Sequence, residues 1–142
     1  KQGVVIVQGT MSTYNLIRAL PEIDKAGVNV KLVAAPSPQL FATQPEAYRK
    51  AVLSDGDRLN STYVTNRARR LMYDWTFNPL AAEYALSSDF DNRWRTGGSM
   101  DEIMEEAHLD PAHVAAGVVR FAKDHAARLK RLEGMLTAAK GA

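Results

Sequence analysis

The feature that most constrains this chain is a strand, helix and strand pattern in its first third. Val4 to Val7 is a short, continuous β-branched run between glycines, which predicts a buried strand. A helical pattern then begins at Thr10 or Ser12 and ends before Gly27, a residue typical of helix C-termini. Residues 28–33 alternate at first and predict a second strand. This βαβ unit implies parallel strands and a right-handed crossover.

Pro21 lies within the first helical pattern, so we expect it to kink or split that helix. The rest of the chain continues the alternation of strands and helices. The other expected elements are one helix or two short ones over 37–54, a turn at Asp55-Gly56, a third strand over 61–65, an ambiguous segment or short helix over 67–76, a break at Asn78-Pro79, a fourth strand over 83–87 and a polar loop over 89–98.

Two clear helix starts follow the polar loop. Ser99 and Glu102 have the spacing of a capping box and predict a short helix of roughly ten residues. Asp110 and Pro111 match an N-cap and a first helical position, and the helix is expected to run to about Ala139. Its apolar stripe consists of Val114, Val118, Phe121, His125, Leu129, Leu132 and Leu136. This stripe is longer than a small domain needs, so we expect part of it to dock on another chain or domain.

Composition excludes several classes without naming a function. With 142 residues, 46% of them hydrophobic, the chain suits a single globular domain, 1–142. A net charge of +2 produces only a weak electrostatic field and gives no argument for nucleic acid as a partner. There is no cysteine, and no apolar run approaches the ~20 residues of a membrane span. We expect a cytoplasmic protein without membrane contact, and the start at Lys1 suggests a segment cut from a longer protein.

The familiar catalytic and metal-binding motifs are missing. Neither the phosphate-binding G-x-x-x-x-G-K-[ST] motif nor the G-x-S-x-G nucleophile elbow occurs. His108, His113 and His125 lack the spacing of a zinc site, so no metal ligand is predicted. Asp89 and Asp91 are two residues apart in the polar loop, where solvated carboxylates are the simpler interpretation. No catalytic residue is therefore assigned.

Two places could bind an anion. Thr10 and Ser12 stand at the start of the first helix, where backbone N–H groups and hydroxyls can hold a phosphate, although a side-chain-capped turn is the more economical interpretation. Asn66 and Arg67 follow the third strand, and ligands in open α/β sheets lie beyond the carboxyl ends of strands. Arg69 and Arg70 extend this basic cluster, which could equally be a solvated or interfacial patch.

Arg93 and Arg95, directly before the capping box, are grouped with Asn66 and Arg67 as one possible anion or regulatory site. Guanidinium groups suit phosphate or carboxylate because their N–H donors match two oxygens at once. The simpler alternative is that they pair with Asp89, Asp91 or a neighbouring subunit while Trp94 packs. Both interpretations stay open at the level of sequence.

The segment after the second strand resembles the C-terminal domain of transketolase and its thiamine-diphosphate-dependent relatives. The resemblance is carried by Pro36-Ser37, Leu40-Phe41, Gln44, Glu46-Ala47-Tyr48-Arg49 and Val52-Leu53. The entry to the second strand, Ala26 to Val30, is also similar, and the order of elements agrees over most of 3–125, although only 36–53 is specific. The chain departs from the family at Thr65-Asn66-Arg67, where a glutamate and a glycine are usual, and in the longer loop from Arg93 to Ser99.

The resemblance implies a three-layer α/β fold with a mostly parallel sheet of about five strands, helices on both faces and a long C-terminal helix. In this family thiamine diphosphate and a divalent metal lie between the first two domains, so no cofactor is expected in this domain. Its implied partners are the N-terminal and middle domains of the parent enzyme and a second subunit, and its role is contact rather than catalysis. The parent could also be of the homodimeric pyruvate dehydrogenase kind. A free-standing α/β module that binds a small phosphate or nucleotide is the alternative from another class.

Overall fold

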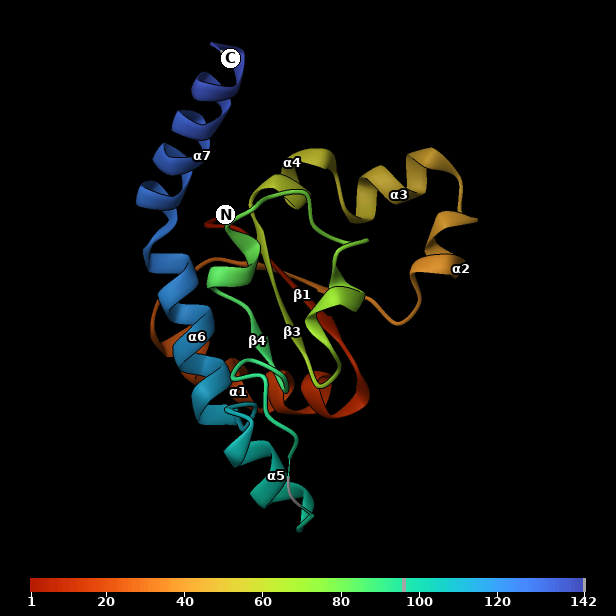
Figure 1. Ribbon diagram of the computed structural model, residues 1–142, viewed down its shortest axis with the longest axis vertical. Helices are drawn as coiled ribbons and strands as arrows, with labels where there is room; N and C mark the ends of the chain where they lie inside the picture. The colour runs from red at the N-terminus through yellow and green to blue at the C-terminus, as the bar shows by residue number, and fades with distance from the viewer. Residues whose placement is uncertain (96, 142) are drawn as a thin grey trace.

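The computed structural model describes residues 1–95 and 97–141, which form a parallel sheet with helices on both faces (Figure 1). The strands, in spatial order β2-β1-β3-β4, are β1 (Val4–Gln8), β2 (Lys31–Ala34), β3 (Ser61–Thr65) and β4 (Leu86–Ser87). The helices are α1 (Thr10–Lys25), α2 (Pro38–Ala42), α3 (Glu46–Val52), α4 (Asp55–Leu59), η1 (Arg69–Met72), η2 (Ala81–Glu83), α5 (Met100–Glu106), α6 (Pro111–Lys123) and α7 (His125–Lys140). The α/β class and its layers are as predicted, but the described residues form four strands rather than about five.

The opening βαβ unit is confirmed, with two adjustments. Helix α1 continues without a break past Pro21, which lies on the exposed side of the helix. Gly27 follows the helix at φ 66°, the left-handed conformation expected after a C-cap. Strand β2 begins at Lys31 rather than at residue 28, because Lys31 pairs with Val4, where the ladder of β1 starts.

One face of the sheet is covered by regular amphipathic helices. Helices α1 and α6 pack against each other, and α1 packs against β1. The core here consists of Val5, Val7, Leu16, Ala19, Ile23, Val64, Met104, Ala107, Leu109, Val114, Ala115, Val118 and Phe121. The capping box of Ser99 and Glu102 and the Asp110 N-cap both form as predicted, so local cap chemistry fixes where α5 and α6 begin.

The opposite face is covered differently. Its core consists of Val4, Ile6, Val33, Ala35, Leu53, Tyr63, Met72, Trp75 and Ala81. The predicted helical region 37–54 forms two short helices, α2 and α3, and neither contains a buried residue. They project from the sheet on the side opposite α6 and α7 in Figure 1. Phe41 attaches this region to the core through Trp75, with ring centroids 5.2 Å apart.

Two predicted boundaries around β3 and β4 are wrong. Asp55-Gly56 opens helix α4 instead of a turn, because Ser54 and Asp57 form a reciprocal capping box. The fourth strand spans only Leu86–Ser87, since Thr65, its last partner, ends β3, and η2 occupies the preceding residues. The segment 67–76 contains the short η1 helix, and the 89–98 loop has neither helix nor strand in its described residues; Thr96 lies outside them.

The last predicted helix is two helices that meet at Asp124. The Asp124 carboxylate accepts a hydrogen bond from the Tyr84 hydroxyl at 3.3 Å, and α7 begins one residue later. Arg128 is only 1% exposed and donates hydrogen bonds to the carbonyls of Phe121 and Gln2 and to the Asn60 side chain. The bend therefore carries one buried arginine to the amino-terminal edge of the sheet. The apolar stripe is buried along α6 but largely exposed along the distal half of α7, which extends away from the sheet (Figure 1).

Candidate functional site

The carboxyl ends of β1 and β3 bring together two of the predicted site segments. These neighbouring strands continue into connections on opposite faces of the sheet, which is where α/β folds place ligands. Gly9 has φ 99°, and a Cβ built on it would lie 1.8 Å from Oδ1 of Asn66, so no other residue fits here. The Ser12 hydroxyl donates to the same Asn66 oxygen at 3.2 Å. The first turn of α1 and the turn after β3 therefore form one unit.

Helix α1 begins without a side-chain cap, contrary to the capped turn that the sequence favoured. Gly9 is the N-cap, and the Ser12 side chain is directed to Asn66 instead of the helix end. The first intrahelical hydrogen bond runs from the Thr13 N–H to the Gly9 carbonyl at 3.0 Å. The N–H groups of Thr10, Met11 and Ser12 have no acceptor among the described residues. They leave the positive end of a 16-residue helix open.

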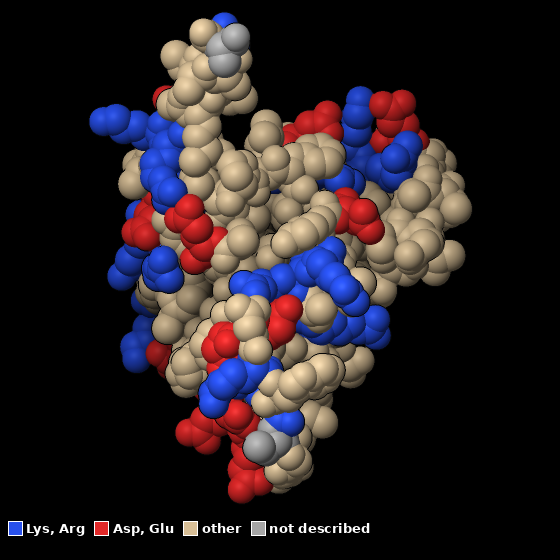
Figure 2. Space-filling model, viewed as in Figure 1, with Lys and Arg blue, Asp and Glu red and all other residues tan. Residues whose placement is uncertain are grey.

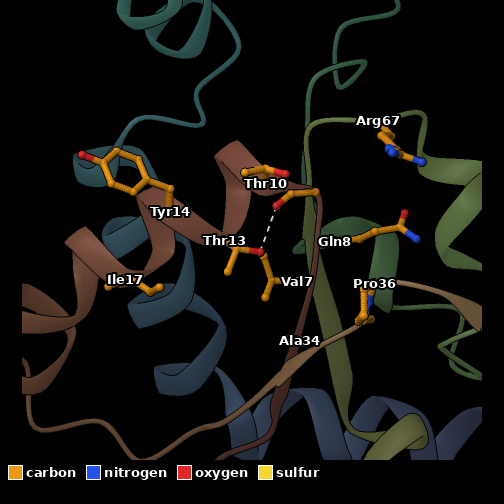
Figure 3. Close-up of a pocket in the computed structure, with 11 residues that line it drawn as sticks. Val7, Gln8, Thr10, Thr13, Tyr14, Ile17, Ala34, Pro36 and Arg67 are labelled. Carbon is orange, nitrogen blue, oxygen red and sulfur yellow. Dashed lines mark hydrogen bonds between the residues drawn. The ribbon is translucent and has the colours of Figure 1, made fainter. Parts of the chain in front are cut away.

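A cleft of about 530 Å³ lies beside this helix end (Figure 3). It is lined by Val7, Gln8, Gly9, Thr10, Thr13, Tyr14, Ile17, Ala34, Ala35, Pro36 and Arg67. In Figure 3 the Gln8 side chain extends away from β1 toward the side where Arg67 and Pro36 lie. Gln8 is 6% exposed, and its Oε1 has no hydrogen-bond partner among the described residues. Sequence analysis missed Gln8, although an amide at the end of a buried β-branched run is itself a signal.

The three arginines after β3 have different surroundings. Arg69 pairs with Asp89 at 3.4 Å and donates to the Asn92 side chain at 2.7 Å. Arg67 lines the cleft, and its guanidinium has no partner among the described residues. Figure 2 shows Lys and Arg side chains interleaved with Asp and Glu over the face that it displays.

Arg93 and Arg95 do not join the cleft; both are paired within their own loop. The Asp91 carboxylate accepts hydrogen bonds from Arg93 at 2.7 Å and from Arg95 at 2.6 Å. Arg95 also donates twice to the Ser88 carbonyl. Desolvation acts to raise the pKa of Asp91, but these arginine hydrogen bonds outweigh it and lower the pKa to about 2. Pairing with Asp91 is thus the arrangement that the structure shows, whereas Trp94 is 98% exposed and does not pack.

The histidines form no recognisable centre. The rings of His108 and His113 stack with centroids 4.4 Å apart, and His113 contacts the Asp110 carboxylate. Burial and the charge of Arg128 lower the pKa of His125. Within residues 1–95 and 97–141, no group of three or more His, Asp or Glu side chains is placed to hold a metal ion. No helix in that part of the chain is long and apolar enough to cross a membrane.

A second buried polar group lies deeper on the same sheet. The Tyr63 hydroxyl has no hydrogen-bond partner among the described residues, and burial raises the pKa of Tyr63 to about 12. Tyr63 pairs with Ile6 in the sheet register, two residues before Gln8 on the same face. Two buried side-chain oxygens of the sheet, Gln8 Oε1 and the Tyr63 hydroxyl, therefore have no hydrogen-bond partner among the described residues.

The scan against protein-family models finds no match for this chain, and the search of curated proteins finds none either.

Proposed function

We propose that the chain is the C-terminal domain of a thiamine-diphosphate-dependent enzyme of the transketolase kind, in which it makes contacts with other domains and with a second subunit. The observation that carries this proposal is the placement of the segment 36–53. Most of the side chains that carry the family resemblance lie on α2 and α3, which contain no buried residue, whereas Leu53, directly after α3, is buried in the core. Leu40 is 69% exposed and Tyr48 is 54% exposed.

Exposed large apolar side chains such as Leu40 and Tyr48 are typical of an interface. A large exposed apolar patch usually marks a binding surface, because it gains little while it faces water. Between this segment and β2 lies a cleft of about 430 Å³ that Leu40, Phe41 and Tyr48 help to line. The outer edge of β2 carries no further strand among the described residues. We therefore assign α2, α3 and the edge of β2 to the contact with the rest of the parent enzyme.

The distal part of α7 is a second contact candidate. Leu136 is 57% exposed and Met135 is 42% exposed, on a helix that extends beyond the sheet (Figure 1). A homodimeric pyruvate dehydrogenase is the other parent enzyme consistent with the same resemblance. In either parent, thiamine diphosphate and its divalent metal belong to the other domains.

The experiment uses the whole protein encoded by the reading frame that contains this chain. We expect Leu40→Asp with Tyr48→Asp to weaken its assembly in light scattering, because two charges enter an apolar interface. The matched control is Leu59→Asp on α4, an exposed leucine outside the contact segment. Calorimetry on the isolated chain should detect no thiamine diphosphate binding. Tight binding there, or a reading frame without thiamine-diphosphate domains, would contradict the proposal.

A further inference from the structure

The open end of α1 is the strongest unassigned feature of the molecule. Backbone N–H groups at a helix start favour anions, both because they lack helical acceptors and because the helix dipole is positive there. Thr10, Met11 and Ser12 present such groups beside a cleft, with no acceptor among the described residues. A helix start alone also suits water, so a ligand needs independent support.

Gln8 provides that support. A buried amide oxygen without a hydrogen bond is unfavourable, so such groups persist mainly where a ligand or another group provides the missing partner. Gln8 is 94% buried, lines the cleft, and has a side-chain oxygen without a partner among the described residues. This amide can accept a hydrogen bond from a hydroxyl of a ligand in the cleft.

The charge and shape of the cleft narrow the ligand class. No acidic residue lines the cleft, and its one charged lining residue is Arg67, whose guanidinium has no partner among the described residues. A volume of about 530 Å³ exceeds the needs of a bare anion. Tyr14, Ile17 and Pro36 add an apolar wall beside the polar end. The combination suits a small organic molecule with one anionic end.

We propose that this cleft binds a small organic phosphate monoester. The phosphate oxygens accept hydrogen bonds from the N–H groups at the start of α1 and from Arg67, and a ligand hydroxyl donates to Gln8. This site adjoins the contact segment, because Ala34 and Pro36 line both clefts, but its polar groups come from β1, α1 and the turn after β3. The proposal does not depend on which enzyme is the parent. Arg67 is available to a ligand, whereas the guanidinium groups of Arg93 and Arg95 already donate hydrogen bonds to the Asp91 carboxylate.

The test is titration of the chain with glycerol 3-phosphate, followed by calorimetry and by amide chemical shifts, at fixed ionic strength. We expect saturable binding with the largest shifts at residues 9–13, and weaker binding of inorganic phosphate. Arg67→Ala should weaken binding about tenfold or more, since a charge-assisted hydrogen bond contributes about 1.5–3 kcal/mol. Arg70→Ala removes the same charge from an exposed site outside the cleft lining and should change affinity less than about twofold.

Two further variants address the helix end and the amide separately. Thr10→Pro removes one N–H donor at a position where proline suits a helix, so the fold should persist while phosphate affinity falls. Gln8→Leu should lower affinity for glycerol 3-phosphate but not for inorganic phosphate, while the free energy of unfolding holds or rises. Absence of saturable binding, equal losses for Arg67→Ala and Arg70→Ala, or equal affinity for the two phosphates would overturn the proposal.

Discussion

The two faces of the sheet are covered by different kinds of structure. On one face, α1 and α6 present periodic apolar stripes whose side chains are buried against β1 and β3. On the other, α2 and α3 contain no buried residue, and the core is closed by Met72 and Trp75 from a short 3₁₀ helix and a turn. Helices α1 and α6 therefore stabilise this chain, whereas α2 and α3 contribute little to its stability. The second kind is available for binding another surface.

The largest expected effect is on the helix-covered face. Phe121 is fully buried in α6, between the sheet and the Arg128 guanidinium, which lies 3.6 Å from its ring centroid. Phe121→Ala should lower the free energy of unfolding by about 3–5 kcal/mol, because it leaves a cavity that rigid neighbours cannot fill. Urea denaturation measures this, with Leu136→Ala on exposed α7 as the control. A loss below about 1 kcal/mol would contradict the importance assigned to α6.

An intermediate effect is expected from substitution of Asp57, which links helix α4 to Lys31 of strand β2. Its carboxylate pairs with Lys31 at 2.8 Å and with Lys1, and it completes the capping box of α4. Burial acts to raise the pKa of Asp57, but the lysine hydrogen bonds outweigh it and hold the pKa well below its ordinary value. Asp57→Asn should cost about 2 kcal/mol at pH 7, from the loss of charge-assisted hydrogen bonds.

The sign of the pH dependence follows from that lowered pKa. A carboxylate with a depressed folded pKa adds stability above its unfolded value, near 3.9, and loses it as the pH falls toward the folded pKa. The difference between the wild-type chain and Asp57→Asn should therefore be constant from about pH 5 upward and shrink below about pH 4. Asp55→Asn, an exposed neighbour in the same helix, is the control. A difference that grows on acidification would contradict the ion-pair role.

The smallest expected effect tests the other side of the comparison. Leu40→Ala should change the free energy of unfolding of the isolated chain by less than about 0.5 kcal/mol, because the side chain is already 69% exposed. The same change in the whole parent protein should weaken assembly measurably. A loss of stability comparable with that of Phe121→Ala would show that α2 belongs to the core of this chain after all.

Local chemistry explains which parts of the fold could be predicted. Gly27, the capping box at Ser99 and the Asp110 N-cap each act within one helical turn, so their effect is visible in sequence. The length of β4 depends on where β3 ends, and the bend at Asp124 depends on Tyr84, forty residues earlier in the chain. Contacts between distant segments have no local signature.

The candidate site shows the same division. The turn at Thr10 and Ser12 and the segment Asn66-Arg67 were predicted from strand ends, and the fold places them side by side through the contact of Gly9 with Asn66. Sequence could not distinguish Arg67 from Arg95, because both are arginines in polar connections and only their tertiary partners differ. The burial of Gln8 required the complete sheet.

The buried side chain of Arg128 has a consequence for the order in which this protein acquires its structure. Its hydrogen bond to the Gln2 carbonyl at 2.8 Å closes a loop of 126 residues, almost the length of the chain. Closing so long a loop is entropically unfavourable until most of the intervening chain is ordered. We therefore expect the amino-terminal edge of the sheet, although synthesised before the other elements described here, to become fully stable only after α7 has left the ribosome.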